Sequence, residues 1–362
     1  MFYYRIAGLT LRSQCALPAF AAFACGPADA DVTLEQTDKS PGPGKDRRSG
    51  IILHRRLDGG FYYHLGDAQR QGLYASADHS QLRLLGVEQD AVPEPLERLV
   101  RIALECLFAR RGFVSLHAAA VETADGAYAF TGPSQIGKST RARAWAEALD
   151  AGLISGDRPL IDVRRGMLYG VPWDGKEQCF RNMCCPLRAI LEVRRSDSVY
   201  VRTLSASQRR KLLLRQCFLP MWDTETAAMQ MTNITRLAAG AEIVRVFCGP
   251  TAQDVPALRA ALRERRFLKE EPDMKVKEGF VLRHIVDDYF VMPTDDNIGI
   301  FRGTILLNET AALVWQKLQN PVSRDDLLHA ILDEYDVDEP IAAADLDALL
   351  ARLRDYDVIE DD

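Results

Sequence analysis

The residues from Gly132 to Ser139 have the types and spacing of a phosphate-binding loop. They read Gly-Pro-Ser-Gln-Ile-Gly-Lys-Ser and fit the pattern G-x-x-x-x-G-K-[ST] at every fixed position. The glycines let such a loop curl so that backbone N–H groups point at phosphate, the lysine reaches the β- and γ-phosphates, and the serine hydroxyl coordinates Mg²⁺. The sequence therefore predicts a nucleotide site, with ATP and Mg²⁺ as its expected ligands. Its expected binding residues are Gly132, Pro133, Ser134, Gln135, Ile136, Gly137, Lys138, Ser139 and Thr140.

Two further residues have side chains that could act on a bound nucleotide. His117 lies in an apolar run before the loop, and Asp157 ends a strand 19 residues after Lys138. Taken alone, a histidine on an apolar strand is usually a core residue with its hydrogen bonds satisfied, and an aspartate before Pro159 is typical of a turn. Taken with the loop, they give the order strand-His, strand-loop-helix, strand-Asp.

That order resembles the catalytic domain of the HPr kinase/phosphorylase family, over roughly residues 110–270. The resemblance implies a P-loop kinase core in which Asp157 is the base that activates an acceptor serine. It also implies that Lys138 and Mg²⁺ neutralise the transferred phosphoryl group, while His117 assists near the γ-phosphate. The family usually has two consecutive aspartates where this chain has Gly156-Asp157, and it has a later Leu-Glu-hydrophobic-Arg-Gly signature that is missing here. The chain thus resembles a divergent branch found with modified-peptide pathways.

The segment Pro172-Trp-Asp-Gly-Lys-Glu177 stands in place of that signature. Glu177 is a candidate for a Mg²⁺ contact beside Ser139, and a solvated turn residue fits it equally well. Lys176 and Arg181 are candidates for contact with phosphate or with the acceptor.

The elements that must position these residues alternate between strands and helices, which predicts an α/β fold. Short β-type runs separated by turn residues fill positions 1–94, and a helix is expected over 95–110. We expect a β-rich N-terminal region with its connecting helix over 1–110 and the kinase domain over 111–270. The loop and its partners are expected on strands 114–121, 127–131 and 153–163 and on helix 141–149. A last helix is expected to begin at Ala257 and run into a linker near Lys277.

Residues 275–362 have a different pattern. Three strands are expected over 281–285, 289–292 and 298–307, followed by helices over 308–318, 323–335 and 342–356. The stretch Leu307-Asn-Glu-Thr-Ala-Ala-Leu-Val-Trp315 resembles the PqqD family of peptide chaperones, the peptide-recognition element of ribosomal-peptide pathways. The resemblance implies a winged helix-turn-helix domain that binds a leader peptide as an added strand. We expect that strand near Ile300–Leu306, against the helix that carries Leu346 and Leu350.

Charge and hydropathy exclude several other classes of protein. The formal net charge is -6, and residues 321–362 carry 14 acidic and 3 basic side chains. Such a segment would be repelled by nucleic-acid phosphates, so a peptide partner is expected instead. No run of 18 apolar residues occurs, so we expect no membrane span and a cytoplasmic protein. The eight cysteines form no C-x-x-C pair.

The sequence therefore favours an ATP-dependent kinase that phosphorylates a serine of a ribosomally made precursor peptide, with leader capture by the C-terminal domain. Lasso-peptide tailoring is the first pathway class that the resemblance suggests. One alternative is a regulatory kinase that acts on a folded carrier protein, as HPr kinase does. Another is an ATP-gated peptide chaperone without catalysis. The sequence leaves homo-oligomerisation open.

Overall fold

The computed structural model describes residues 1–38, 51–65, 71–87, 90–173, 181–268, 273–285, 288–294 and 304–361. The chain divides into two compact units, Met1–Leu268 and Lys269–Asp362. Both contain helices and sheets, so the chain is a mixed α/β protein. The expected boundary near residue 110 lies inside the first unit and stays a prediction. No helix among the described residues is long and apolar enough to cross a membrane.

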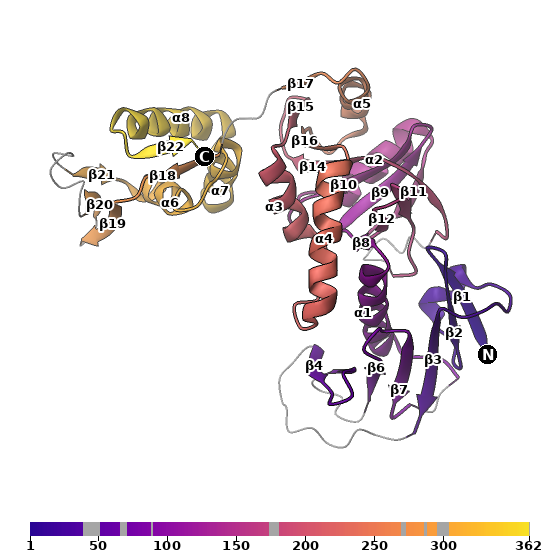
Figure 1. The fold of residues 1–362 in the computed structure, drawn as a ribbon. Helices are drawn as coiled ribbons and strands as arrows, with labels where there is room; N and C mark the ends of the chain where they lie inside the picture. Colours follow the sequence, from indigo (N-terminus) through magenta and orange to yellow (C-terminus); the bar gives the residue numbers. More distant parts are fainter. Residues whose placement is uncertain are drawn as a thin grey trace. The chain divides into compact units, whose positions relative to one another are not determined.

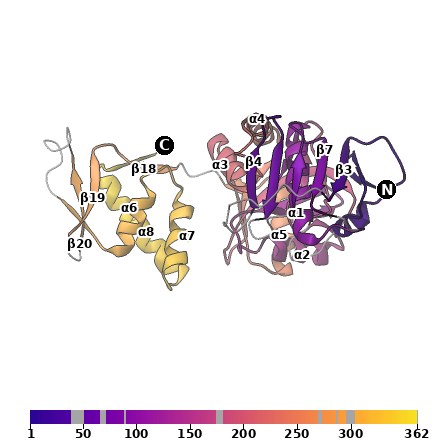
Figure 2. The same ribbon diagram turned by 90° about the horizontal axis from the view of Figure 1, so that it is seen from below.

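A seven-stranded sheet opens the first unit (Figure 2). Its strands, in the spatial order β1-β2-β3-β7-β6-β5-β4, are β1 (Phe2–Ile6), β2 (Leu9–Ser13), β3 (Val32–Thr37), β7 (Gln81–Leu85), β6 (Gly72–Ala75), β5 (Phe61–Leu65) and β4 (Ile51–Arg55). Strands β1 and β2 form an antiparallel hairpin. Ala7 and Gly8 turn it with φ values of 47° and 84°, which a continuous strand does not adopt.

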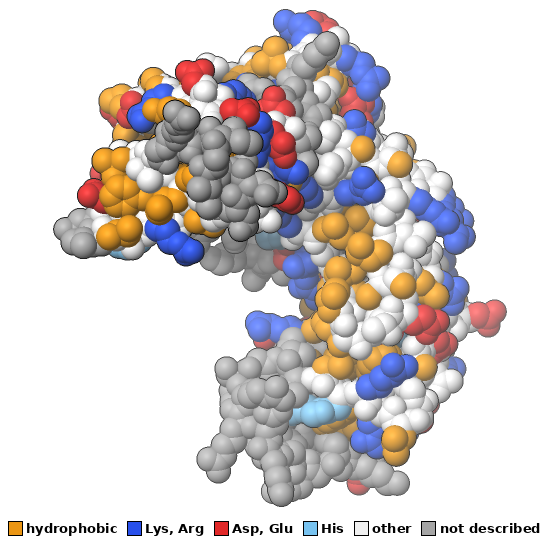
Figure 3. Space-filling view, turned by 60° about the vertical axis from the view of Figure 1, so that its left-hand side comes forward, with side chains coloured by type: hydrophobic (Ala, Val, Ile, Leu, Met, Phe, Trp, Pro, Cys, Tyr) orange, Lys and Arg blue, Asp and Glu red, His pale blue; other side chains and the backbone are white. Residues whose placement is uncertain are grey.

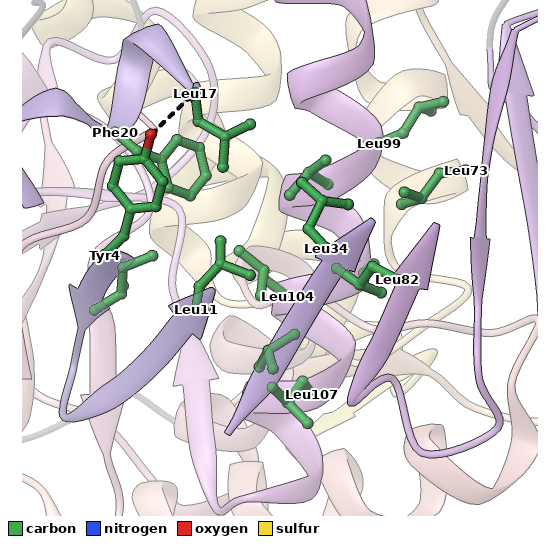
Figure 4. Close-up of a cluster of buried hydrophobic side chains, with 14 of the residues drawn as sticks. Tyr4, Leu11, Leu17, Phe20, Leu34, Leu73, Leu82, Leu99, Leu104 and Leu107 are labelled. Carbon is green, nitrogen blue, oxygen red and sulfur yellow. Dashed lines mark hydrogen bonds between the residues drawn. The ribbon is translucent and has the colours of Figure 1, made fainter. Parts of the chain in front are cut away.

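Helix α1 (Glu94–Arg110) covers this sheet and confirms the helix expected over 95–110. Its buried leucines recur at helical spacing and meet leucines from the strands, among them Leu34 and Leu82 (Figure 4). At the edge of the cluster lies the short helix η1 (Pro18–Phe23), where the Tyr4 hydroxyl accepts a 2.8 Å hydrogen bond from the Leu17 amide. Burial of each such leucine contributes about 1.5–3 kcal/mol to the stability of the fold. The helix and the sheet are therefore held together as two packed layers.

A ten-stranded sheet forms the rest of the first unit. Its strands are β8 (Phe113–Ser115), β9 (Ala118–Thr123), β10 (Gly126–Thr131), β11 (Gly152–Ser155), β12 (Leu160–Asp162), β13 (Met167–Tyr169), β14 (Cys184–Arg194), β15 (Tyr200–Thr203), β16 (Ile243–Phe247) and β17 (Phe267–Leu268). Strand β14 runs parallel to both β10 and β16, whereas β9 is antiparallel to β10 and β11.

Helices cover both faces of this sheet, as its parallel core requires. Helices α3 (Ala206–Gln216) and α4 (Thr224–Gly240) pack on one face, where Leu213 and Leu237 are buried. Helices α2 (Lys138–Leu149) and α5 (Val255–Arg263), with the short η2 (Ala252–Asp254), pack on the other around Trp145. Figure 1 shows α3 and α4 side by side.

Three expected elements differ from the structure. The last helix begins at Val255 rather than Ala257 and ends at Arg263, and Arg265, with φ of 52°, turns the chain into β17, a strand that the sequence did not predict. The strand expected over 153–163 is split into β11 and β12 by a turn at Arg158, whose φ is 53°. The strand expected over 114–121 is interrupted between β8 and β9.

The second unit has its own hydrophobic core around Trp315, Leu346 and Leu350. Its elements are β18 (Met274–Val276), β19 (Phe280–Ile285), β20 (Asp288–Pro293), β21 (Ile305–Leu307), α6 (Glu309–Lys317), α7 (Arg324–Glu334), α8 (Glu339–Asp355) and β22 (Ile359–Asp361). Strands β19, β20 and β21 form an antiparallel sheet, and β18 pairs with β22. Asn308 and Ser323 are the N-caps of α6 and α7, where each side chain accepts a backbone hydrogen bond.

Candidate functional site

Three strand ends bring the candidate residues of the first unit together. Because β9 and β10 are antiparallel, with Ala118 opposite Thr131, the residue before β9 lies beside the loop that follows β10. The Thr131 hydroxyl donates a 2.9 Å hydrogen bond to the His117 carbonyl and fixes this neighbourhood. Strand β11 also runs antiparallel to β9, with Ser155 opposite Ala120, so Asp157 follows at the same edge. The structure thus places His117, the loop and Asp157 at one end of three adjacent strands.

The loop has the backbone form that its glycines allow. Gly132 and Gly137 have φ values of 141° and 94°, which side chains with a Cβ rarely adopt. Gly137 is the N-cap of α2, so the first turn of this helix, which includes Ser139 and Thr140, presents free N–H groups beside the loop. Such amides and the helix dipole favour an anion at this position.

Lys138 begins α2 and is buried. Its ammonium donates hydrogen bonds to the carbonyls of Gly132, at 3.2 Å, and Pro133, at 2.9 Å. The lysine is therefore folded back onto the first two residues of the loop. Burial lowers the pKa of Lys138, with a further lowering by the Arg158 cation, while the Asp157 carboxylate acts in the opposite sense.

His117 and Asp157 face one another at 3.8 Å between Nε2 and Oδ1. The Asp157 Oδ1 atom is buried and has no hydrogen-bond partner, although Ser155 anchors the backbone by donating a 2.7 Å bond to the Asp157 carbonyl. A buried carboxylate oxygen without a partner is uncommon in folded proteins. It is an acceptor that is free for a hydroxyl proton or a cation, so this atom fits the role of a base that the sequence suggested.

The surroundings of His117 favour its neutral form. Burial lowers the pKa of this imidazole, and the nearby Lys138 and Arg158 cations lower it further. The Asp157 carboxylate and a hydrogen bond with Gln216 raise it, but these are outweighed. At neutral pH the imidazole is therefore uncharged, and it can accept or donate a hydrogen bond near the loop.

Arg158 is a site residue that the sequence did not reveal. It is held in the left-handed region, with φ of 53°, between Asp157 and Pro159. A non-glycine residue in this region is strained, and such strain gathers at functional sites. Its charge acts on both Lys138 and His117. In the sequence, the available signal for Arg158 was its position directly after Asp157, the candidate base. Its left-handed backbone conformation could not be predicted, because it is a property of the tertiary structure.

Arg181, another candidate from the sequence, does not join this site. The Arg181 guanidinium donates to the Leu153 carbonyl at 3.2 Å and lies 3.8 Å from Glu122. Glu122 is five residues along the chain from His117, which corresponds to about 16 Å of strand, so Arg181 contacts the far end of β9. Lys176 and Glu177 lie outside the described residues. No group of three or more His, Cys, Asp or Glu side chains that could hold a metal occurs in the described part of the chain.

A second candidate site is a groove of about 710 Å³ in the C-terminal unit. Strand β21 forms one wall and α8 the other, with residues from α6 and the end of α7 between them. Strand β21 pairs with β20, and its other edge has no partner strand among the described residues. Leu306 on this strand is 56% exposed. Leu349 of α8 gives the groove an apolar wall, and Arg352 and Asp345 give it charge.

Comparison with known proteins assigns the C-terminal unit. Residues 291–359 match the family model described as Coenzyme PQQ synthesis protein D (PqqD). The C-terminal unit contains a PqqD-like domain. Among solved structures, the chain is similar to "TbiB1 in Complex with the TbiA(beta) Leader Peptide" at 23% identity. That likeness covers 24% of this chain and 94% of the other, and its TM-score of 0.21 is too low to support a structural argument. No curated protein matches the chain.

Proposed function

We propose that the protein is an ATP-dependent kinase that phosphorylates a serine of a ribosomally made precursor peptide, and that its PqqD-like domain captures the leader. The observation that supports the chemistry best is the orphaned, buried Oδ1 atom of Asp157 beside a phosphate-binding loop. The PqqD match supports a peptide as the partner. The finer assignments, a P-loop kinase core of the HPr-kinase type and a winged helix-turn-helix, belong to the same proposal.

In this proposal each candidate residue of the first unit has its own role in phosphoryl transfer. The loop amides and Lys138 bind the phosphates, and Ser139 at the start of α2 is the residue that would hold Mg²⁺. Bound Mg²⁺ supplies positive charge against the phosphate oxygens. The oxygen of the acceptor serine attacks the terminal phosphorus, and ADP leaves. During this attack Asp157 accepts the proton of the serine hydroxyl through Oδ1. His117, neutral at pH 7, donates a hydrogen bond beside the transferred group.

The groove between β21 and α8 is the proposed leader site. A leader in extended form adds to the free edge of β21, where main-chain hydrogen bonds give affinity. Alternate side chains of the leader then point into the groove, so that Leu349 contacts an apolar residue and Arg352 an acidic or polar one. Capture raises the local concentration of the acceptor serine, which reaches mM values for a short flexible connection.

The test is transfer of label from γ-labelled ATP to a serine-containing precursor peptide encoded beside the gene of this protein. We expect Mg²⁺-dependent phosphoserine on the peptide, and none with Lys138→Ala, which removes the buried phosphate contact. The same Lys138→Ala protein should bind the leader as the unchanged protein does. ATP binding without transfer would favour the non-catalytic chaperone, and transfer to a folded carrier protein alone would favour a regulatory kinase.

A further inference from the structure

Two arginines hold the outer side of the phosphate-binding loop. Arg141 Nη1 donates to the Ile136 carbonyl at 2.9 Å and to the Gly137 carbonyl at 3.4 Å. Arg195, the residue directly after β14, donates from Nη2 to the Gln135 carbonyl at 3.0 Å. Three successive loop carbonyls are thus held by guanidinium groups from two different parts of the chain.

This arrangement fixes the direction of the loop amides. The peptide unit is planar and trans, so the N–H of each residue points away from the carbonyl of the residue before it. Holding the carbonyls of residues 135, 136 and 137 therefore turns the N–H groups of Ile136, Gly137 and Lys138 to the opposite side. That side is the one where the loop pattern predicts phosphate.

Arg141 is an unusual residue to bury at this position. It is only 3% exposed, and no carboxylate pairs with it among the described residues. Its remaining contacts are to Cys248 after β16, where Nε lies 3.2 Å from the sulfur and Nη2 lies 2.5 Å from the carbonyl oxygen. A buried cation without a counter-charge is costly to fold. The Arg141 guanidinium is held instead by backbone carbonyls of the loop and of Cys248.

Gly137 leaves the space that Arg141 needs. A Cβ at position 137 would lie 2.7 Å from Arg141 Nη1, which is closer than side-chain atoms pack. The glycine thus has a second role beside its left-handed φ of 94°. Gly137, a fixed position of the loop pattern, thus leaves room for the guanidinium of Arg141, which follows four residues later in the chain.

We propose that Arg141, assisted by Arg195, is a positioning residue that orients the loop amides toward phosphate before nucleotide binds. This inference rests on the proposed nucleotide binding. Arg141 touches no reacting atom and acts through the loop carbonyls. Because the amides are already oriented, the protein loses little conformational freedom when nucleotide binds, and preorganisation of this kind increases affinity.

The test uses the full chain with Arg141→Met, Arg195→Met and, as a control, Arg236→Met, which changes an exposed arginine of α4. The Kd for Mg·ATP is measured by calorimetry. We expect an increase of about tenfold or more for Arg141→Met, which corresponds to about 1.4 kcal/mol, about threefold for Arg195→Met, and no change for Arg236→Met. Where turnover is measured, the KM for ATP rises in the same proportion, and kcat at saturating ATP stays within about twofold.

Amide hydrogen exchange without nucleotide separates this inference from the proposed function. The amides of residues 136–138 should exchange faster in Arg141→Met than in the unchanged protein, and ATP should restore part of their protection. Failure of the unchanged protein to bind ATP would count against the proposed function, while the exchange data would still decide the role of Arg141. Equal exchange and equal ATP affinity in a folded Arg141→Met protein would overturn the inference. Should that variant not fold, an Arg195→Met protein with unchanged affinity and exchange would overturn it.

Discussion

The charge of His117 depends on two neighbours that act in opposite directions. Lys138 lowers the pKa of the imidazole and Asp157 raises it, while burial keeps it below the ordinary value of 6.5. We expect the midpoint of an NMR titration of His117 to lie below 6.5 in the nucleotide-free protein. Lys138→Ala should move this midpoint up, and Asp157→Asn should move it down. A shift of the same sign in both variants would contradict this arrangement of charges.

The sign of this shift also sets a pH window. A histidine whose pKa is lower in the folded than in the unfolded state binds its proton more readily when the chain is unfolded. The folded state therefore loses stability as pH falls below about 6.5, the unfolded value. Above that pH both states carry a neutral imidazole, and His117 contributes no pH dependence.

Asp157→Asn tests the proposed base. The amide keeps the size of the side chain but cannot take up the serine proton, so we expect transfer to fall by two or more orders of magnitude. ATP binding should persist, because the loop and Lys138 are unchanged. The matched control is Asp150→Asn, at an exposed left-handed position after α2 that asparagine also tolerates. Calorimetry and labelled transfer measure both, and near-normal transfer by Asp157→Asn would place the base elsewhere.

At the scale of elements, the sequence located the loop because its residues are contiguous. Helices α3 and α4 were not predicted, and α4 shows why. Its inner face buries the polar residues Gln230 and Asn233, whose amides donate to the carbonyls of Phe218 and Ala109. Its outer face carries exposed Met229 and Met231. Figure 3 shows hydrophobic side chains, in orange, exposed on the surface of the protein. The apolar stripe, of which Ile234 and Leu237 are buried, is thus weakened by polar residues on the buried face and methionines on the exposed face.

Contacts between distant residues explain why other features could not be predicted. Arg141 finds its partner Cys248 at a separation of 107 residues, and no local pattern signals such a pair. Arg181 was a plausible phosphate contact by charge alone, but the structure directs it to Leu153 and Glu122. Family resemblance suggested that His117 and Asp157 belong to one site, whereas their 3.8 Å separation is known only from the structure, in which antiparallel strands bring them together.

The two outer strands of the sheet β19-β20-β21 offer a matched test of the leader site. Leu306 on β21 and Ile285 on β19 are exposed to almost the same extent, 56% and 54%, but Leu306 borders the groove and Ile285 does not. Leu306→Asp should weaken binding of a synthetic leader at least about tenfold, since the added strand loses an apolar neighbour and covers a charge. Ile285→Asp should leave the affinity unchanged. Calorimetry measures both, and equal losses would show that the groove is not the site.

At the scale of the whole molecule, each hydrophobic core is made of residues from one of the two units. The cores of the first unit contain residues up to Phe267, and the core of the second begins at Met274. We expect residues 1–268 to fold alone and bind ATP within about twofold of the full chain. Their KM for the precursor peptide should rise by about two orders of magnitude, because the effective concentration of a captured peptide is lost.

The isolated unit of residues 269–362 is the complement of that experiment. Titration with a synthetic leader should show saturable binding without ATP. A folded fragment that binds no leader, together with normal turnover of full-length precursor by residues 1–268, would assign the second unit a structural role.

The pairing of β18 with β22 has a consequence for how such proteins arise. Met274 lies opposite Asp361 and Val276 opposite Ile359. The first strand of the unit, β18, is therefore paired with its last strand, β22. A segment closed in this way can be transferred by recombination from one host protein to another, because no part of the host has to thread through it. On the proposed function, recognition of the leader and modification of the peptide can then evolve at different rates.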